Sequence, residues 1–538
     1  MFTAKPQSTS SSPARTYSLQ ALLYGAAGAL TAEVLLSGVN DGSAVLQPLG
    51  RMLIVGLTLY TMHRFAVAAF RQYRPRIKDA CALTIVLLFS ILIISVGRIL
   101  ALSLANYLSV ARHMTDLHAN SFEFAIPFAA GGLLLQAVFG LQYGLVLGVS
   151  LAAIVGVYSP YQPVMSLYVC VSTLVASLSL SSFRSRSAYL KAGLRISVLS
   201  LPFAFASIFF EPSVSASDLS IRLLAALAGG LFAAILAAGF IPALEYLGGY
   251  VTDLRLIEMA TLDHPLLKEL SVQCPGTWNH SMVMGMMVEG AASTIGANSV
   301  LARVGAYFHD IGKIRKPLYF VENQAGGENR HERLSSSMSA LIIRSHVKDG
   351  IELSRKHGMP QQLEDMIPQH HGTSRIEYFY DKACKEAVEG GEDVASVDVN
   401  LYSYPGPRPQ TREAALLMLA DGIEAATRTI SDPSYDRIQG LVQKMINKVF
   451  ASGELDECEL TLKDLHSIAK SFTRVLSGIY HQRIAYAEPA EKGNEREEVE
   501  EETAASLDNR GAAKYKKAET EEKEDPGDGK EDLKRLGI

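Results

Sequence analysis

The first 250 residues contain apolar segments that are long enough to cross a lipid bilayer. A helix needs about twenty mostly apolar residues to span the hydrocarbon core, and residues 85–94 read Ile-Val-Leu-Leu-Phe-Ser-Ile-Leu-Ile-Ile without a charge. Such a segment has no polar face to turn towards water, unlike a helix on the surface of a soluble protein. We expect eight membrane-spanning helices, at residues 19–38, 47–70, 79–103, 122–140, 141–159, 163–183, 190–210 and 220–246.

Basic residues between these segments indicate how the chain is oriented. The loop after the second segment carries four Lys or Arg within residues 71–78, and the loop after the sixth carries four within residues 184–195. Lys and Arg accumulate in the short cytoplasmic loops of membrane proteins. The loop after the seventh segment carries Glu211 and Asp218 with Arg222, as an external loop does. We therefore expect a multi-pass protein of the cell membrane, embedded in the lipid bilayer with both termini in the cytoplasm.

The sequence changes character after the last apolar segment. Apolar residues there recur at the spacing of amphipathic helices, and the alternation typical of strands is scarce. We expect helices through 281–305, 335–356 and 411–429, with the stretch 381–410 interrupting them because it is acidic and then rich in proline. The predicted fold class is all-α: a polytopic helical membrane domain followed by a cytoplasmic all-α domain.

Composition sets the remaining boundaries. The C-terminal residues are rich in Glu and Lys and too poor in apolar side chains to form a core. The five cysteines form no CxxC pair, which argues against a zinc knuckle and against a disulfide framework. The predicted parts are a polar N-terminal segment at 1–18, a transmembrane domain at 19–248, an amphipathic connector at 249–274, a helical domain at 275–485 and a disordered charged tail at 486–538.

Histidines gather in one part of the predicted cytoplasmic domain. Eight of the thirteen fall between His264 and His371. The most informative is the adjacent pair His309-Asp310, because an imidazole and a carboxylate on one short segment can hold a metal ion between them. Asp421 lies on a predicted apolar helix, where an unpaired buried carboxylate would be costly. The predicted metal ligands are His280, His309, Asp310, His346, His370, His371 and Asp421.

This ligand set indicates two metal ions and the hydrolysis of a phosphate ester. A single catalytic ion needs about three protein ligands, whereas two ions can share one bridging carboxylate and activate a shared water. We assign the bridge to Asp310, with one ion held by His280, His309, Asp310 and Asp421 and the other by Asp310, His346, His370 and His371. Asp310 and Lys313 are the predicted catalytic residues, and Lys313 and Arg375 the predicted substrate contacts. Imidazole with carboxylate suits Fe, Mn, Co or Zn and disfavours Mg.

Six motifs carry a resemblance to a known family. They are Pro275–Ser281, Tyr307–Lys313, Tyr319–Gln324, Ser345–Gly350, Gln369–Thr373 and Tyr404–Gln410. Together they resemble the HD phosphohydrolases, and more narrowly the seven-transmembrane receptor HD hydrolase family of the PgpH type. The resemblance implies an HD-type fold for the cytoplasmic domain, two divalent ions that are Fe or Mn, and hydrolysis of cyclic di-AMP to pApA. It implies the same seven ligands that the residue types indicate.

The chain departs from the family pattern in two places. Trp278-Asn279 stands where Tyr-His is usual, immediately before His280. Family members usually carry a large extracellular domain after the first span, whereas only a short stretch around 40–47 occupies that place here.

Two alternatives to cyclic di-AMP hydrolysis stay open. One is an HD hydrolase of another nucleotide, cyclic di-GMP or ppGpp. The cyclic di-GMP class carries Gly-Tyr-Pro after its His-His pair, where this chain has Gly372-Thr373-Ser374. The other is a membrane receptor whose HD domain binds nucleotide without turnover. The expected partners are a cyclic dinucleotide substrate and the bilayer, without a nucleic acid polymer, and a homodimer stays open.

Overall fold

The fold is helical throughout the part of the chain that the structure describes. This computed structural model describes residues 13–37, 46–70, 73–114, 117–159, 163–179, 185, 187–211, 214–324 and 329–480. Within these ranges the only β-type pairing is one isolated bridge between Arg375 and Ser403. The predicted all-α fold class is therefore confirmed. Most of the predicted N-terminal segment, the short stretch at 38–45 and the predicted charged tail lie outside the described residues.

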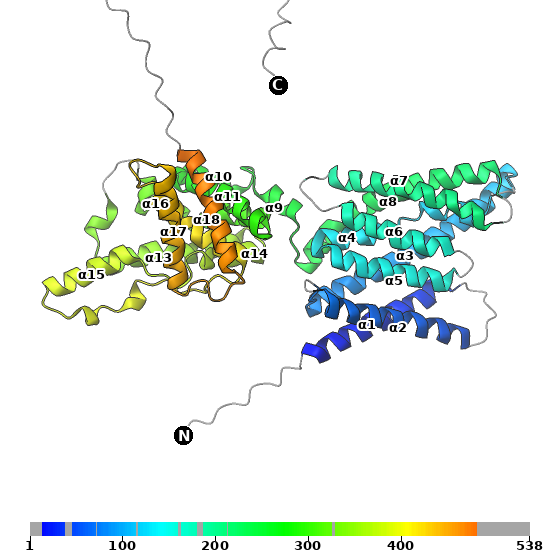
Figure 1. The fold of residues 1–538 in the computed structure, drawn as a ribbon, viewed down its shortest axis with the longest axis horizontal. Coiled ribbons are helices and arrows are strands. Elements are labelled where there is room, and N and C mark those ends of the chain that lie inside the picture. The colour runs from blue at the N-terminus through cyan, green and yellow to red at the C-terminus, as the bar shows by residue number, and fades with distance from the viewer. Residues whose placement is uncertain are drawn as a thin grey trace, which may run out of the picture. The chain divides into compact units, whose positions relative to one another are not determined.

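Among the described residues of the apolar part there are eight α-helices, one in each predicted segment (Figure 1). They are α1 (Pro13–Leu36), α2 (Leu46–Ala69), α3 (Ile77–Arg112), α4 (Ala130–Phe139), α5 (Leu141–Tyr158), α6 (Pro163–Ser179), α7 (Ser187–Ser207) and α8 (Ala216–Gly248). Seven described stretches are long and apolar enough to cross a membrane. The eighth helix, α6, is shorter at 17 residues, and α4 reaches spanning length only with the 3-10 turns that precede it from Ala119.

Small residues allow the membrane helices to approach one another closely. A Cβ added to Gly25 in α1 would lie 2.7 Å from the carbonyl oxygen of Gly56 in α2. A Cβ added to Gly230 in α8 would lie 2.5 Å from the carbonyl oxygen of Gly193 in α7. Helices in a bilayer associate through such close packing, because lipid tails are as apolar as the helices themselves.

One buried charge in the membrane part is neutralised by neighbouring carboxylates. The Arg222 guanidinium in α8 lies 2.9 Å from Asp218 and 2.5 Å from Glu211.

Ten further α-helices follow the membrane part within the described residues. Two short ones lie within residues 249–274, where the sequence predicts a connector: α9 (Asp253–Met259) and α10 (Pro265–Gln273). The others are α11 (Pro275–Ile295), α12 (Ser299–Phe308), α13 (Ser336–Lys356), α14 (Gln361–Gln369), α15 (Glu377–Glu389), α16 (Arg412–Thr427), α17 (Tyr435–Ala451) and α18 (Leu462–Tyr480). Between α12 and α13 the described residues include the 3-10 turns η4 (Ile311–Arg315), η5 (Pro317–Tyr319), η6 (Val321–Asn323) and η7 (Arg330–Arg333). Met284, Phe308, Leu417 and Phe472 lie in the shared core of this domain.

Two of the predicted helix boundaries are wrong. The expected helix through 281–305 is two helices, because Gly296 adopts a left-handed φ of 70° and the Asn298 side chain caps the backbone N–H of Leu301. The stretch 381–410 is not an interruption throughout, since α15 continues to Glu389. Its charged side chains suggested a loop, but Phe379 and Ala383 bury one face of this helix. The expected start of α13 is confirmed: the Ser335 hydroxyl accepts from the Met338 N–H.

Candidate functional site

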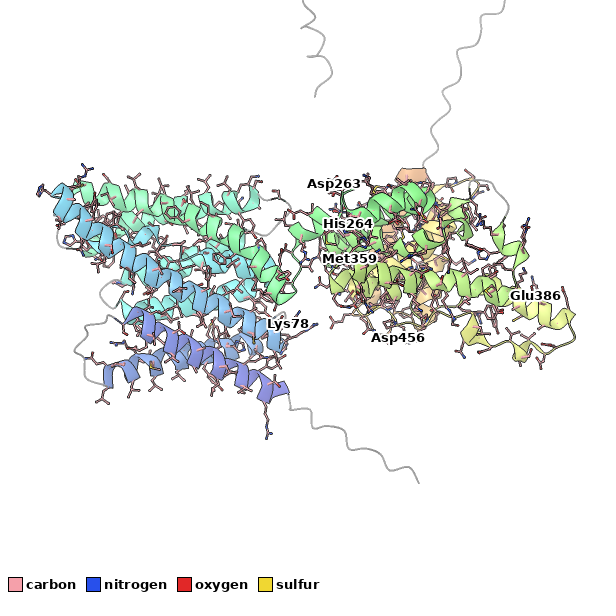
Figure 2. All side chains as sticks on the ribbon, turned by 180° about the vertical axis from the view of Figure 1, so that it is seen from behind. Lys78, Asp263, His264, Met359, Glu386 and Asp456 are labelled. Carbon is pink, nitrogen blue, oxygen red and sulfur yellow. The ribbon has the colours of Figure 1, made fainter. Side chains whose placement is uncertain are left out.

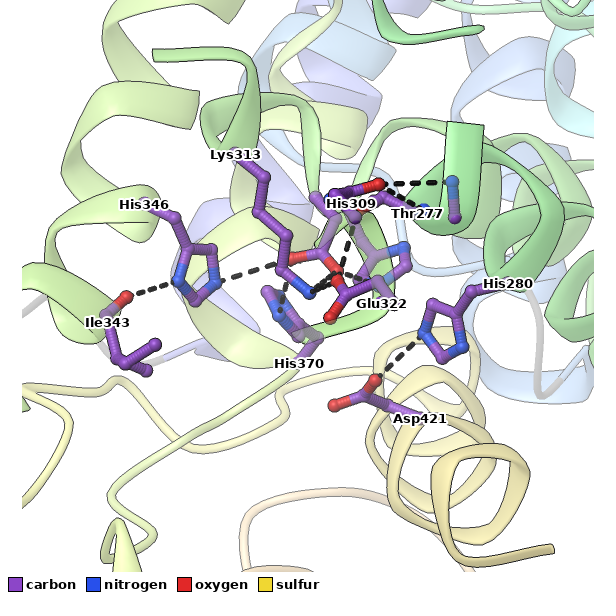
Figure 3. Close-up of polar contacts among 12 residues, drawn as sticks. Thr277, His280, His309, Lys313, Glu322, Ile343, His346, His370 and Asp421 are labelled. Atoms are coloured by element: carbon purple, nitrogen blue, oxygen red, sulfur yellow. Dashed lines mark hydrogen bonds and ion pairs between the residues drawn. The ribbon is translucent and has the colours of Figure 1, made fainter. Parts of the chain in front are cut away.

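The seven predicted ligands lie together at the ends or on the inner faces of five helices. Figure 3 labels five of them, His280, His309, His346, His370 and Asp421. His280 is in α11, His346 in α13 and Asp421 in α16. His309 and Asp310 directly follow the last residue of α12, and His370 and His371 directly follow the last residue of α14. A helix end is well suited to this role, because two consecutive side chains there can both turn inward, whereas neighbours within a helix point in different directions.

Asp310 lies at the centre of the group. Its Oδ2 is 3.1 Å from His309 Nε2 and 2.7 Å from Lys313 Nζ. Its Oδ1 is 3.4 Å from His346 Nε2 and 3.7 Å from His370 Nε2. The carboxyl group is 1% exposed, so these side chains and not water surround it.

Six of the predicted ligands form two groups of three, and Asp421 contacts both groups. Potential ligand atoms of His280, His309 and Asp310 lie within 4.8 Å of one another, and so do those of His346, His370 and His371. These two groups match the two predicted ligand sets with two differences. The first predicted set also contains Asp421, and the second also contains Asp310. Asp421 contacts both, with Oδ1 3.0 Å from His280 Nε2 and Oδ2 3.6 Å from His371 Nδ1.

Three imidazoles are oriented by the backbone of their own helices. The Nδ1 atoms of His309, His346 and His370 lie 2.7, 2.6 and 2.6 Å from the carbonyl oxygens three residues earlier, at Ala306, Ile343 and Ile367. A carbonyl can only accept a hydrogen bond, so each Nδ1 carries the proton and donates it. When such a ring is neutral, its Nε2 is left with a lone pair that points at the centre of the site.

These lone pairs have no hydrogen-bond donor. Nε2 of His309, His346 and His370 and Oδ1 of Asp310 are all buried without a hydrogen-bond partner among the described residues. Leaving a buried polar atom unsatisfied costs about 1–3 kcal/mol, so four such atoms converging on one point require an explanation. Divalent transition-metal ions satisfy this donor set, since neutral imidazole nitrogens and carboxylates are their usual ligands.

The protonation states agree with this donor set. Burial lowers the pKa of His346, His370 and His371, that of His371 to about 3, so these rings are neutral. Burial alone would raise the pKa of Asp310, but the adjacent His309 and Lys313 hold it well below its usual range. His280 differs: burial lowers its pKa, yet Asp421 and Glu424 outweigh burial and raise it to about 9. An ion bound by His280 must therefore displace a proton.

Two family models match the chain at the parts just described. Residues 45–252 match the model of a 7TM receptor with intracellular HD hydrolase, and residues 277–426 match the model of the HD domain. The chain belongs to the 7TM receptor HD hydrolase family. All seven predicted ligands fall within the part that matches the HD domain.

Two curated relatives are similar to most of the chain. The cyclic-di-AMP phosphodiesterase PgpH of Bacillus subtilis (strain 168) is 32% identical over 466 residues, which is 85% of this chain and 62% of the relative. The protein of the same name from Listeria monocytogenes serotype 1/2a (strain 10403S) is 35% identical over 369 residues, 68% of this chain and 50% of the relative. The chain thus spans less than two thirds of the length of either relative.

A solved structure resembles the HD domain in sequence. The crystal structure of the L. monocytogenes phosphodiesterase PgpH HD domain in complex with cyclic-di-AMP is 42% identical to the part that it matches. It covers 41% of this chain and 100% of its own chain, with a TM-score of 0.38.

Of the two predicted substrate contacts, Lys313 touches the seven-ligand site of the HD domain (the HD site) and Arg375 does not. Lys313 Nζ lies between two carboxylates, 2.7 Å from Asp310 and 2.8 Å from Glu322. Burial lowers the pKa of this ammonium, but the two carboxylates outweigh burial and raise it above its usual value, so the charge is kept. The Arg375 guanidinium lies 4.4 Å from the centre of the Tyr380 ring. Among the described residues, the Arg375 side chain makes no hydrogen bond or ion pair with any of the seven ligands.

Two acidic residues of the HD site were not predicted. Glu424 is fully buried, with Oε2 2.5 Å from His280 Nδ1, and Glu322 accepts from the Thr277 hydroxyl at 3.0 Å as well as from Lys313. Glu424 could have been found, because it follows Asp421 by three residues and so shares its face of α16. Glu322 gives no such signal, since it lies in a run of 3-10 turns without helical periodicity.

We predict that Glu424→Gln weakens metal binding by about tenfold to a hundredfold, the usual effect of removing a carboxylate that orients a ligating histidine. The amide keeps the size of the side chain but removes the charge that faces His280 Nδ1. Isothermal titration of the metal-free full-length chain with Mn²⁺ measures the change. Glu413→Gln, on the first turn of the same helix and bonded to the Asn298 N–H, is the matched control and should leave affinity unchanged. Equal affinity of the two variants would contradict the orienting role of Glu424.

Proposed function

We propose that this chain is a membrane-anchored, metal-dependent phosphodiesterase that hydrolyses cyclic di-AMP to pApA. The single observation that carries the proposal is the convergence of unpartnered imidazole nitrogens on Asp310. The family membership and the names of the two relatives support the substrate. The proposed location is the cell membrane, with both termini and the HD domain in the cytoplasm.

The site residues fit two divalent ions, for which we propose Fe or Mn. His280, His309, Asp310 and Asp421 would hold one ion, and Asp310, His346, His370 and His371 the other. Such a pair of ions supplies positive charge for phosphate oxygens and lowers the pKa of a bound water. The expected preference for Fe or Mn over Mg follows from the five imidazoles, because Mg²⁺ prefers oxygen ligands.

The protein side chains contribute position and charge. Lys313 keeps Asp310 ionised and fixes Oδ2, because its ammonium lies between Asp310 and Glu322. Asp310 Oδ1 remains directed at His346 and His370. Beside them, the Tyr404 ring stacks on His371, with centroids 4.1 Å apart and planes inclined by 21°. We propose that Lys313 also attracts a substrate phosphate, and that Arg375 contributes a second cation for the same ligand.

The full-length chain in detergent or in nanodiscs provides the test of the proposed function. Treatment with a chelator should abolish turnover, and Mn²⁺ or Fe²⁺ but not Mg²⁺ should restore it. The product of cyclic di-AMP, resolved by chromatography, should be pApA. Much faster cleavage of cyclic di-GMP or ppGpp would overturn the substrate. Tight binding of cyclic di-AMP by the metal-loaded chain without any product would favour a receptor without turnover. The complete ligand set disfavours that receptor, since a site that only binds nucleotide does not need seven ligands.

A further inference from the structure

An open apolar groove lies in the membrane part, between the first half of α3 and the last turns of α8, with Leu134 of α4 at its side. Its volume is about 680 Å³, within the range of pockets that hold a small molecule. Ile85 and Leu247 on its walls are 61% and 83% exposed. The groove is therefore open to the surroundings of the helix bundle, and in a membrane these surroundings are lipid.

The groove is apolar at one end and polar at the other. At the apolar end the rings of Phe89 and Phe240 are in contact, with centroids 4.5 Å apart. At the polar end Lys78 Nζ lies 4.8 Å from the centre of the Tyr250 ring. Phe89 comes eleven positions after Lys78, which corresponds to about 16 Å along α3. Figure 2 shows Lys78 at the N-terminal end of α3.

The polar end has an excess of positive charge. Arg74, Arg76 and Lys78 are all exposed there, at the start of α3. The carboxylate of Asp79 is already engaged: the Tyr250 hydroxyl donates to it at 3.0 Å and the Arg76 backbone N–H at 2.9 Å. No carboxylate of the described residues lies within ion-pair distance of Lys78. The N-terminus of a helix as long as α3 adds its own partial positive charge.

We propose that this groove binds one anionic phospholipid, with an acyl chain along Ile85 and Phe240 and the phosphate at Lys78. The ligand must be an amphiphile, because the groove joins an apolar wall to a cationic mouth. It must carry net negative charge, since three exposed cations, Arg74, Arg76 and Lys78, outnumber the carboxylate of Asp79 at the mouth. A helix from a second copy of this chain would fill the apolar part but would not by itself satisfy Lys78. The lipid would also contact Tyr250, the side chain that joins the end of α8 to the start of α3.

Retention of lipid by the full-length chain tests the proposal independently of enzyme activity. The chain is reconstituted with phosphatidylglycerol and phosphatidylcholine, washed in detergent, and analysed by native mass spectrometry. We expect preferential retention of phosphatidylglycerol. Lys78→Gln should lower that retention by about fivefold, the effect of one cation near anionic lipid. Lys191→Gln removes an exposed cation from α7 and should change nothing.

Two further measurements locate the bound lipid. Cys81 is exposed and lines the groove, so Cys81→Trp should displace phosphatidylglycerol and phosphatidylcholine alike. A phosphatidylglycerol with a photoreactive acyl chain should label peptides that contain residues 77–89 and 240–250. The proposal fails if Lys78→Gln retains as much phosphatidylglycerol as Lys191→Gln, or if the label spreads evenly over α1–α8. It also fails if the two peptides cross-link to a second copy of the chain in place of lipid.

Discussion

Asp310→Asn should reduce the turnover of cyclic di-AMP on the order of 10³-fold, a loss typical of removing one group that stabilises charge in the transition state. Asp310 is the carboxylate that contacts both His309 on one side and His346 and His370 on the other. The amide has the same shape, but it offers one acceptor oxygen in place of two and no charge. We therefore expect metal affinity to fall at least about tenfold as well.

The measurement pairs initial rates with metal analysis of the full-length chain. Asp365→Asn is the matched control, because Asp365 is exposed on α14, the helix that ends just before His370, and its side chain accepts a hydrogen bond from the Gln361 amide. This variant should keep both the rate and the metal content. A fully active Asp310→Asn enzyme would remove the central carboxylate from the proposed mechanism and, with it, the shared position between two ions.

Gly312→Ala should destabilise the HD domain by about 3 kcal/mol or more, the upper part of the range for overpacking in a core. A Cβ at this position would lie 1.8 Å from the carbonyl oxygen of His346 and 2.6 Å from the backbone nitrogen of Gly350. Both atoms belong to the backbone of α13, which cannot rotate away as a side chain can. The 3-10 turn η4 must therefore move from α13, and His346 must move from Asp310.

The only tryptophan of the chain makes this effect measurable in the intact protein. Trp278 lies in the first turn of α11, inside the HD domain, with its ring 5.9 Å from that of Tyr307. Its fluorescence therefore reports unfolding of this domain without a signal from the membrane helices. Gly440→Ala is the control: a Cβ there meets nothing within 4 Å, and Ala inside a helix stabilises by about 0.5–1 kcal/mol relative to Gly. A Gly312→Ala midpoint equal to that of the wild type would contradict the close approach.

The membrane helices were predictable from the sequence because their signal is local. A run such as 85–94 has one structural solution in a bilayer, so each predicted segment contains a helix. Prediction from the sequence fails where tertiary packing, and not the local pattern, determines where a helix begins or ends. Gly296 ends a helix inside an otherwise continuous periodic stretch. The charged residues of α15 suggest a loop, but the burial of Phe379 stabilises a helix there.

The site was predictable only as a set of side chains. Adjacent His309 and Asp310 and the acidic residue on apolar α16 suggest metal ligation through residue type alone. The distances among the five helices depend on the packing of the whole domain, which no local pattern contains. Glu424 lies on the same face as Asp421 and could be inferred, whereas Glu322 reaches Lys313 only because consecutive 3-10 turns fold back towards α11.

The hydrogen bonds from three histidine rings to the carbonyls of their own helices have a consequence for how the centre is loaded. Each ring is held by a carbonyl oxygen three residues earlier in the chain, so these rings do not need an ion to orient them. Uptake should therefore leave the circular dichroism of the protein almost unchanged, and its rate should depend on how quickly each cation loses its water shell. Protein synthesised when metal is scarce would then fold without it and bind metal, without refolding, once the ion becomes available.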